Sequence, residues 1–272
     1  MNTSEIMDLA LELAGLSEIP ADSGILVPGE NIRRVLAGID MEAAEILMAK
    51  KLGYDLVLGH HPAAGSPRVN LHQVMIRQID RMVQAGVPIN KAQKALKKQM
   101  EIVERGLHVT NYDRATSAAK ALKMPYMNIH TPADALSEQK VATHLEQALA
   151  DKPKAKVGDV VDVLMELPEF QSADTKPSIR NGAKDDFAGK VMVAMARGTG
   201  GGPDVEKAYF EAGIGTMVVM HMKDDVREAV KKQNIGNVIV AGHMASDSVG
   251  MNIILDALEA RGLEVTRISG IR

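Results

Sequence analysis

Two apolar segments on either side of one helix-length stretch constrain the fold of this chain more than any other feature. Residues 34–39 and 55–59 are rich in aliphatic side chains, and residues 41–51 between them have helical periodicity, with Gly53 placed to end the helix. A strand, a helix and a second strand within about 25 residues are typical of a right-handed βαβ unit with parallel strands. The chain is therefore predicted to contain a parallel sheet.

The same alternation returns in the last third of the chain. Strands are predicted at residues 190–196, 215–220, 237–241 and 263–268, with helices at 203–211, 224–233 and 246–260. Elsewhere, helices are predicted at residues 6–16, 71–85, 91–104 and 114–122, with a short strand at 107–110. Prolines interrupt the less periodic region from 125 to 177, and residues 170–186 are predicted to form an exposed loop or hairpin. Together these elements predict an α/β protein with two lobes of mixed or parallel sheet flanked by helices.

Composition narrows the chemistry that the chain can use. Hydrophobic residues make up 46% of its 272 residues and charged residues 25%, which is the balance of an ordinary globular protein. Cysteine is absent, so disulfides, thiolate metal sites and cysteine nucleophiles are excluded. The net charge of -3 does not indicate a nucleic-acid partner. No segment approaches the roughly 18 apolar residues of a membrane span, and no basic secretory signal is present, so a cytoplasmic location is expected.

Two adjacent histidines follow the second predicted strand. His60 and His61 come directly after the apolar run at 56–58, at the carboxyl end of a parallel strand, where α/β folds bind ligands. Adjacent side chains on an extended chain point apart, so the two rings are not expected to bind the same ion: they could serve neighbouring ions, or one ring could support a ligand without binding an ion itself. Considered alone, the dipeptide also fits two histidines with ordinary hydrogen bonds.

Other strand ends carry further metal-binding residue types. His243 follows the strand at 237–241, Asp247 lies at the start of the next helix, and Asp113 lies between a predicted strand and helix. Either aspartate alone also fits a helix cap or a favourable helix dipole interaction. Because three strands end in His or Asp at the same predicted sheet edge, the joint pattern indicates a metal site. Imidazoles and carboxylates without thiols suit Zn, Fe, Mn, Co or Ni, and five ligands fit two ions better than one.

A glycine-rich turn, residues 198–203, connects a predicted strand to a predicted helix. Its free backbone amides could hold an anion at the helix N-terminus, but a tight structural turn explains the glycines equally well. The turn lacks the Lys-Ser/Thr of a P-loop, and Pro203 replaces the third glycine of a dinucleotide fingerprint.

Three of these stretches together resemble a known family. Residues 59–62 (GHHP), 110–113 (TNYD) and 241–247 (AGHMASD), with DSG at 22–24 and GTGG at 198–201, look like the YbgI-like family, also called GTP cyclohydrolase type-I-like homologues or NGG-one-interacting-factor-three proteins. The resemblance implies a two-lobed α/β fold, a dinuclear metal site in the cleft between the lobes, and a toroidal homohexamer. By position it implies that the metal ligands are His60, His61, Asp113, His243 and Asp247. For His243 to join the others, the lobes must be discontinuous, so we expect residues 1–125 with 242–272 in one lobe and 126–241 in the other.

The sequence departs from the family pattern at two positions. Asp247 stands where the family usually has glutamate, and the shorter side chain puts a bridge between two ions in doubt. His108 lies five rather than four residues before Asp113, on the other face of an extended segment, and is left out of the ligand set. His221, Gly200 and Gly201 are the expected substrate-side residues, although His221 also fits an ordinary surface position.

Two classes of function follow from this interpretation. In the first, two divalent ions activate water and hold a small polar substrate, a nucleotide or heterocycle, in a hydrolase of the cyclohydrolase, amidohydrolase or phosphoesterase type. In the second, the metal site belongs to a non-catalytic regulatory or interaction protein. Open coordination positions favour the first, and ions fully surrounded by protein ligands favour the second.

Overall fold

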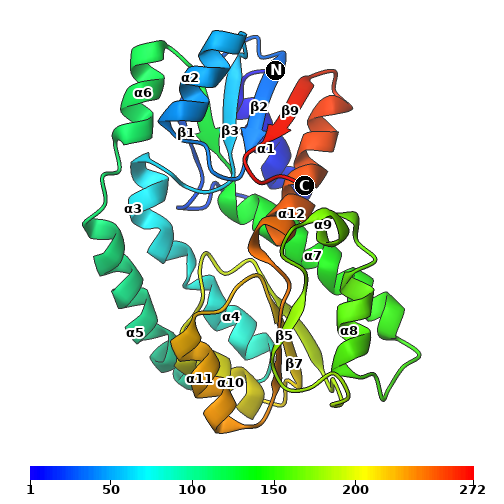
Figure 1. The fold of residues 1–272 in the computed structure, drawn as a ribbon. Helices are drawn as coiled ribbons and strands as arrows, with labels where there is room; N and C mark the ends of the chain where they lie inside the picture. Colours follow the sequence, from blue (N-terminus) through cyan, green and yellow to red (C-terminus); the bar gives the residue numbers. More distant parts are fainter. The chain divides into compact units, whose positions relative to one another are not determined.

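Both sheets of this protein are built mainly from parallel strand pairs, as the computed structural model of residues 1–272 shows (Figure 1). The chain divides into two compact units, each assembled from separate segments. The first contains residues 1–74, 103–137 and 247–272, and the second contains 75–102 and 138–246. The predicted α/β class with two mixed sheets flanked by helices is confirmed. The sequence placed the changeovers at 125 and 241, whereas the compact units change over at 74, 102, 137 and 246.

The first unit has a five-stranded sheet in the order β1-β4-β3-β2-β9. Its strands are β1 (Gly24–Val27), β2 (Arg34–Gly38), β3 (Leu56–Gly59), β4 (Tyr126–Asn128) and β9 (Glu264–Ile268). Only the β1–β4 pair is antiparallel. In Figure 1 the red β9 lies beside the blue β2, because Val35 on β2 is in register with Val265 on β9. The carboxyl ends of β3 and β4 consequently lie at the same edge of the sheet.

Helices of the first unit begin and end where the sequence supplies caps. They are α1 (Thr3–Ala14), α2 (Ala43–Leu52), α3 (Gly65–Val74) and α6 (Arg114–Leu122). The Asn2 side chain accepts a hydrogen bond from the Glu5 amide and caps α1, and Gly15 ends it in the left-handed conformation. Helices α2 and α6 pack together over a core that includes Leu36, Val57 and Tyr126. This core fixes the strands whose ends carry the polar residues described below.

The second unit has a four-stranded sheet in the order β5-β8-β7-β6. Its strands are β5 (Ser178–Asn181), β6 (Val191–Ala194), β7 (Thr216–Val219) and β8 (Asn237–Val240), and only the β5–β8 pair is antiparallel. Its helices are α4 (Arg77–Gln84), α8 (Val157–Leu164), α9 (Pro168–Ser172), α10 (Pro203–Glu211) and α11 (Asp224–Gln233). The predicted alternation of strands and helices in this part of the chain is therefore confirmed.

Three long helices contain three of the four points where the chain changes unit, and the fourth follows the end of α3. They are α5 (Ile89–His108), α7 (His130–Leu149) and α12 (His243–Glu259). The strand predicted at 107–110 is wrong, because α5 continues through Leu107, whose buried side chain continues the apolar face of the helix. The region from 126 to 189 is also more regular than expected, since α7 is 20 residues long and β5 replaces part of the predicted loop.

No helix combines the length and the apolar character that crossing a bilayer requires.

Candidate metal centre

Three histidines of the first unit meet at the carboxyl ends of β3 and β4. His60 and His61 follow β3, and their backbone amides donate to the carbonyls of Gly38 and Ile39 at 2.9 and 3.0 Å. His130 begins α7, directly after β4. The ring centroids of His60 and His61 are 5.0 Å apart, and those of His60 and His130 are 4.9 Å apart.

The outer nitrogen of each ring is held by an acceptor. His60 Nδ1 lies 3.2 Å from the carbonyl oxygen of Ile129, His61 Nδ1 lies 2.8 Å from Asp40 Oδ1, and His130 Nδ1 lies 2.7 Å from Asp22 Oδ2. A carbonyl or a carboxylate can only accept, so each Nδ1 carries a hydrogen. In a neutral ring this leaves the lone pair on Nε2, which is the arrangement found for histidines that bind metal ions.

The inner nitrogens face two buried carboxylates. His60 Nε2 is 3.3 Å from Asp134 Oδ1 and 3.7 Å from Asp247 Oδ1. His61 Nε2 is 3.3 Å from Asp247 Oδ2, and His130 Nε2 is 3.8 Å from Asp134 Oδ2. Within the first unit, the ligand atoms form two groups that could each hold a metal ion, one of the three histidines and one of His60 with Asp134 and Asp247.

The cluster is almost completely buried, so its charged and polar atoms need partners within the protein or a bound ion. The exposed fraction is 0% for His60, 1% for Asp247 and 3% for Asp134. His60 Nε2 and Asp134 Oδ1 lie close together but make no hydrogen bond of acceptable geometry. Two buried carboxylates require a nearby positive charge, because isolated buried charge is strongly disfavoured. The donor set and the unsatisfied buried atoms therefore fit a divalent cation.

The pKa shifts at this cluster reflect the same requirement. Burial acts to lower the pKa of His60, but the carboxylates of Asp247 and Asp134 outweigh it and raise that pKa well above its ordinary value. The pKa of His61 is likewise raised against the effect of burial, because the carboxylates of Asp247 and Asp40 lie on either side of its ring. The site therefore favours positive charge, which either imidazolium groups or a bound cation supplies.

A second layer of hydrogen bonds orients His130. The Thr131 hydroxyl donates to Asp22 Oδ2 at 2.7 Å, and the Asn128 side chain donates to the Asp22 carbonyl at 2.7 Å. Burial acts to raise the pKa of Asp22, but the adjacent His130 ring and the Thr131 donors lower it overall. Asp22 is therefore held as a carboxylate that fixes the orientation of the His130 ring.

Close contact between two helices brings the carboxylates together. Asp134 lies on α7 and Asp247 on α12. A Cβ atom at Gly250, one turn after Asp247, would overlap the backbone carbonyl of Ala133. Only glycine allows the two helix backbones to approach this closely.

Comparison with known proteins places the chain in a family. The family model of Duf34/NIF3 (NGG1p interacting factor 3) matches residues 1–271. The chain belongs to the DUF34/NIF3 family. The resemblance seen in the GHHP, TNYD and AGHMASD stretches is thereby confirmed.

Solved structures of similar proteins support this assignment. A NIF3 superfamily protein from Sphaerobacter thermophilus is 39% identical, with a TM-score of 0.96 over 99% of this chain and 98% of that one. Reduced HcgD from Methanocaldococcus jannaschii is 15% identical, with a TM-score of 0.57 over 98% and 97% of the two chains. The protein ybgI, described as of unknown function, is 16% identical, with a TM-score of 0.56 over 99% and 98%. The last two show a shared fold alone, and no curated protein matches the chain.

The structure of this NIF3 protein places the predicted ligands in different settings. It brings His60, His61 and Asp247 into the cluster. His243 begins α12 four residues before Asp247, so both side chains project from one face of that helix. Asp113 is exposed just before α6, accepts a hydrogen bond from the Ser117 hydroxyl, and belongs to neither of the two ligand groups described above.

Sequence reasoning missed three residues of the cluster, His130, Asp134 and Asp22. The region after residue 125 was interpreted as irregular because of its prolines, although Pro132 occupies the first turn of α7, where proline is tolerated. A histidine and an aspartate four residues apart, directly after a short apolar strand, were the signal that could have identified His130 and Asp134. Asp22 belongs to the DSG stretch of the family resemblance, and no metal-binding pattern surrounds it.

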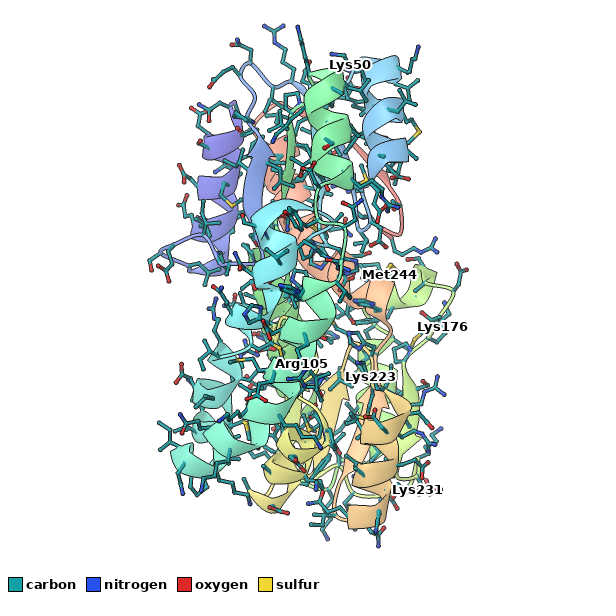
Figure 2. All side chains as sticks on the ribbon, turned by 90° about the vertical axis from the view of Figure 1, so that its left-hand side faces the viewer. Lys50, Arg105, Lys176, Lys223, Lys231 and Met244 are labelled. Carbon is teal, nitrogen blue, oxygen red and sulfur yellow. The ribbon has the colours of Figure 1, made fainter.

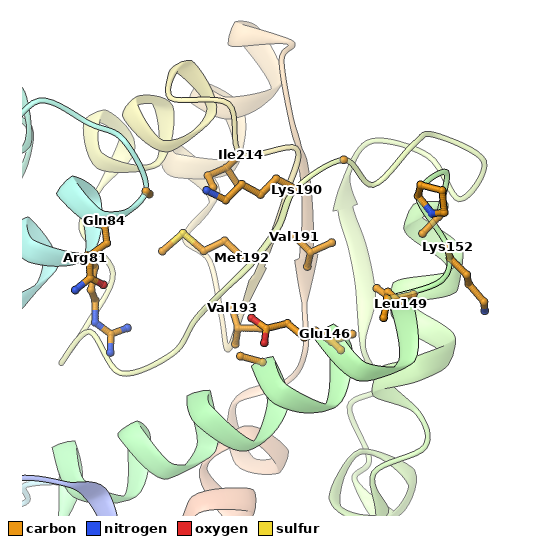
Figure 3. A pocket seen from close by; sticks show the side chains of 17 residues that line it. Arg81, Gln84, Glu146, Leu149, Lys152, Lys190, Val191, Met192, Val193 and Ile214 are labelled. Atoms are coloured by element: carbon orange, nitrogen blue, oxygen red, sulfur yellow. The ribbon is translucent and has the colours of Figure 1, made fainter.

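The second unit contains two pockets, neither of which includes His60, His61 or His130. A pocket of about 530 Å³ lies along the edge strand β6 and α7, and Figure 3 shows Met192, Val193 and Glu146 among its lining side chains. It has no histidine or cluster of carboxylates. A smaller pocket of about 130 Å³ is lined by two of the predicted substrate-side residues, Gly200 and His221. Gly201 is instead buried against Gln78.

Proposed function

We propose that this NIF3 protein binds divalent metal ions through Nε2 of His60, His61 and His130 and the carboxylates of Asp134 and Asp247. The observation that carries the proposal is the common orientation of the three rings, with Nδ1 donating outward and Nε2 facing the two carboxylates. Five donors exceed what a single catalytic ion with an open position uses, so we propose two ions. His243 is proposed as a further ligand from α12.

The proposed activity is hydrolysis of a small polar substrate, a nucleotide or a heterocycle. Bound ions would supply Lewis acidity toward a carbonyl or phosphoryl oxygen and activate water for attack. The protein groups do the remaining work: Asp40 and Asp22 orient the rings of His61 and His130, and burial excludes bulk water. His61 has a side chain that is 21% exposed, so solvent reaches the cluster beside it.

A non-catalytic role is the second candidate, and burial of the cluster favours it. His60 is inaccessible, and Asp134 and Asp247 are nearly so. If the ions are fully surrounded by protein ligands, the site serves the fold or a regulatory partner rather than a reaction. Exchange of a bound water, followed by relaxation measurements on the Mn-loaded protein, separates the two: fast exchange supports the hydrolase and its absence supports the closed site.

Metal content tests the proposal directly. Elemental analysis of protein purified without chelator is expected to show metal in the wild type and its loss in His60→Ala and Asp134→Ala variants. His72→Ala is the matched control, because the His72 ring lies against the Val69 carbonyl in its own helix and belongs to none of the ligand groups. Wild-type protein that stays metal-free when offered Zn, Mn and Fe refutes the proposal.

Self-association and location complete the proposal. Assembly as a homohexamer rests on the family resemblance, and a cytoplasmic location is proposed from the expectation that the sequence gives. Light scattering after size-exclusion chromatography tests the first, and a monomeric mass at all concentrations would contradict it.

A further inference from the structure

A second polar site lies in the second unit, where the glycine-rich turn meets α10. The pocket of about 130 Å³ is lined by Thr199, Gly200 and Gly202 of the turn, and by Arg197 and Glu206 on either side of it. His221 and Lys223 also line it, and Lys223, labelled in Figure 2, directly precedes α11. None of the three clustered histidines contributes to this pocket.

A buried ion pair forms the most constrained part of the pocket. Arg197 Nη1 donates to Glu206 Oε1 at 2.7 Å, and the two residues are 5% and 2% exposed. Burial acts to lower the pKa of Arg197, but the Glu206 carboxylate outweighs it and raises that pKa overall. The Arg197 guanidinium therefore stays charged, and each partner uses only one of its polar atoms in this bond.

The second oxygen of Glu206 makes the pair incomplete. Glu206 Oε2 is buried and has no hydrogen-bond partner. A buried acceptor left without a donor costs roughly 1–3 kcal/mol, and more when it is charged. Only Nη1 of Arg197 takes part in the bond to Glu206, and Nε and Nη2 do not. The pocket therefore offers the unpaired Glu206 oxygen as an acceptor beside the Arg197 guanidinium, with Asp225 and Gln99 also in its lining.

The glycine-rich turn is held by Gln78 on one side and is open on the other. Gln78 donates to the carbonyls of Arg197 and Thr199, both at 2.9 Å, and fixes the turn from behind. A Cβ atom at Gly201 would overlap Gln78, whereas a Cβ atom at Gly200 would meet nothing within 4 Å. Gly200 therefore faces the open side of the turn, where it lines the pocket.

The amino-terminal end of α10 adds backbone N–H groups as further donors. Gly202 at its N-cap brings no side chain to the free amides, and Pro203 follows at the first position. The positive end of the helix dipole is thus left to attract an anion. At about 130 Å³ the pocket is smaller than the roughly 300 Å³ of ordinary ligand pockets, so it suits a single ionic group.

We propose that this pocket binds a singly protonated phosphate group, either inorganic or at the end of a phosphate monoester. The P–OH proton donates to Glu206 Oε2, and the unprotonated oxygens accept from Arg197 and from the amino-terminal end of α10. Sulfate has the same shape but no proton at neutral pH, so it would leave Glu206 Oε2 without a donor and bring negative charge against it. The inference goes beyond the proposed function, because it needs no metal ion.

Calorimetry on chelator-treated protein tests this proposal separately from the metal centre. Inorganic phosphate is expected to bind, with sulfate roughly tenfold to a hundredfold weaker, the difference made by one hydrogen bond to a charged group. Equal binding of the two anions, or no phosphate binding at millimolar concentration, overturns the proposal. Either result leaves the metal proposal standing, because elemental analysis decides that one.

Two variants test the role of the Glu206 oxygen and of the open space at Gly200. Glu206→Gln replaces the acceptor with an amide that can donate, so sulfate binding is expected to strengthen and phosphate binding to weaken. Because that change also removes the charge that balances Arg197, Gly200→Val provides a test that leaves the ion pair intact. Its side chain enters the pocket and is expected to abolish phosphate binding, whereas Gly106→Val, at another glycine with open space around its Cβ position, is expected to leave binding unchanged. Unchanged phosphate binding in Gly200→Val overturns the proposal.

Discussion

Replacing Asp134 with asparagine should separate the stability of the metal-free protein from its response to metal. Asp134 Oδ1 lies 3.3 Å from His60 Nε2, and Oδ2 lies 3.8 Å from His130 Nε2. Asp134 Oδ1 is buried without a hydrogen bond. The amide keeps the shape of the side chain but removes the charge. Metal affinity should therefore fall while the fold is retained.

The magnitude follows from linkage between metal binding and folding. A ligand present at a hundredfold excess over its Kd stabilises the folded state by about 2.7 kcal/mol. Loss of one charged ligand should weaken binding at least tenfold, which removes about 1.4 kcal/mol or more of that gain. In chelator, the substitution should leave the free energy of unfolding unchanged or raise it, because it removes one of two neighbouring buried negative charges.

Thermal unfolding measured in chelator and in a Zn or Mn titration provides the assay. The matched control is Asp113→Asn, because Asp113 is the exposed aspartate that the sequence pattern nominated as a ligand. We expect the metal-dependent rise in Tm to shrink in Asp134→Asn and to persist in Asp113→Asn. If the two variants behave in the opposite way, the ligand set inferred from the structure is refuted and the sequence-based set is supported.

Three further substitutions test the packing around the site and the sheet. Gly250→Ala should destabilise the first unit by about 1–3 kcal/mol and weaken metal binding, because the added methyl forces α12 away from Ala133; chemical denaturation with and without metal measures both effects. Tyr126→Phe should cost about 1–3 kcal/mol in urea unfolding, because the buried Tyr126 hydroxyl donates to the Met41 carbonyl at 2.8 Å and the variant leaves that carbonyl unpaired. Arg267 lowers the pKa of Glu259, so the pair adds stability above the ordinary glutamate pKa of about 4.3 and loses it as pH falls through the lowered value. Wild-type protein should therefore lose slightly more stability than Glu259→Gln on acidification from about pH 5, and an identical acid profile would contradict this.

The sequence predicted the fold well where hydrophobic periodicity and turn residues agreed. Helices α10 and α11 were predicted to their end residues, because Pro203 and the αL residue Asn234 mark their limits. The strand expected at 107–110 failed because a short apolar run fits a strand as readily as the end of a helix. Here α5 continues through Leu107, and the buried side chain of Leu107 fits the helix.

The candidate site was predictable only in part, for a geometric reason. His60 and His61 stand at a strand end, a position that sequence reveals, and Asp247 lies in the helix that follows another strand. His130 and Asp134 become partners of these residues through the parallel pairing of β3 with β4, which no local pattern encodes. The approach of α7 to α12 at Gly250 is likewise a tertiary contact, and a glycine inside a predicted helix does not by itself indicate such a contact.

The pairing of β2 with β9 has a consequence for how this protein is made. Some 230 residues separate the two strands, so the first sheet has an exceptionally long loop to close and cannot be finished until the last strand leaves the ribosome. All four strands of the other sheet emerge earlier, between residues 178 and 240. During synthesis the second sheet can therefore assemble while β2 still exposes one unpaired edge, and the nascent chain is most open to misassociation in that interval.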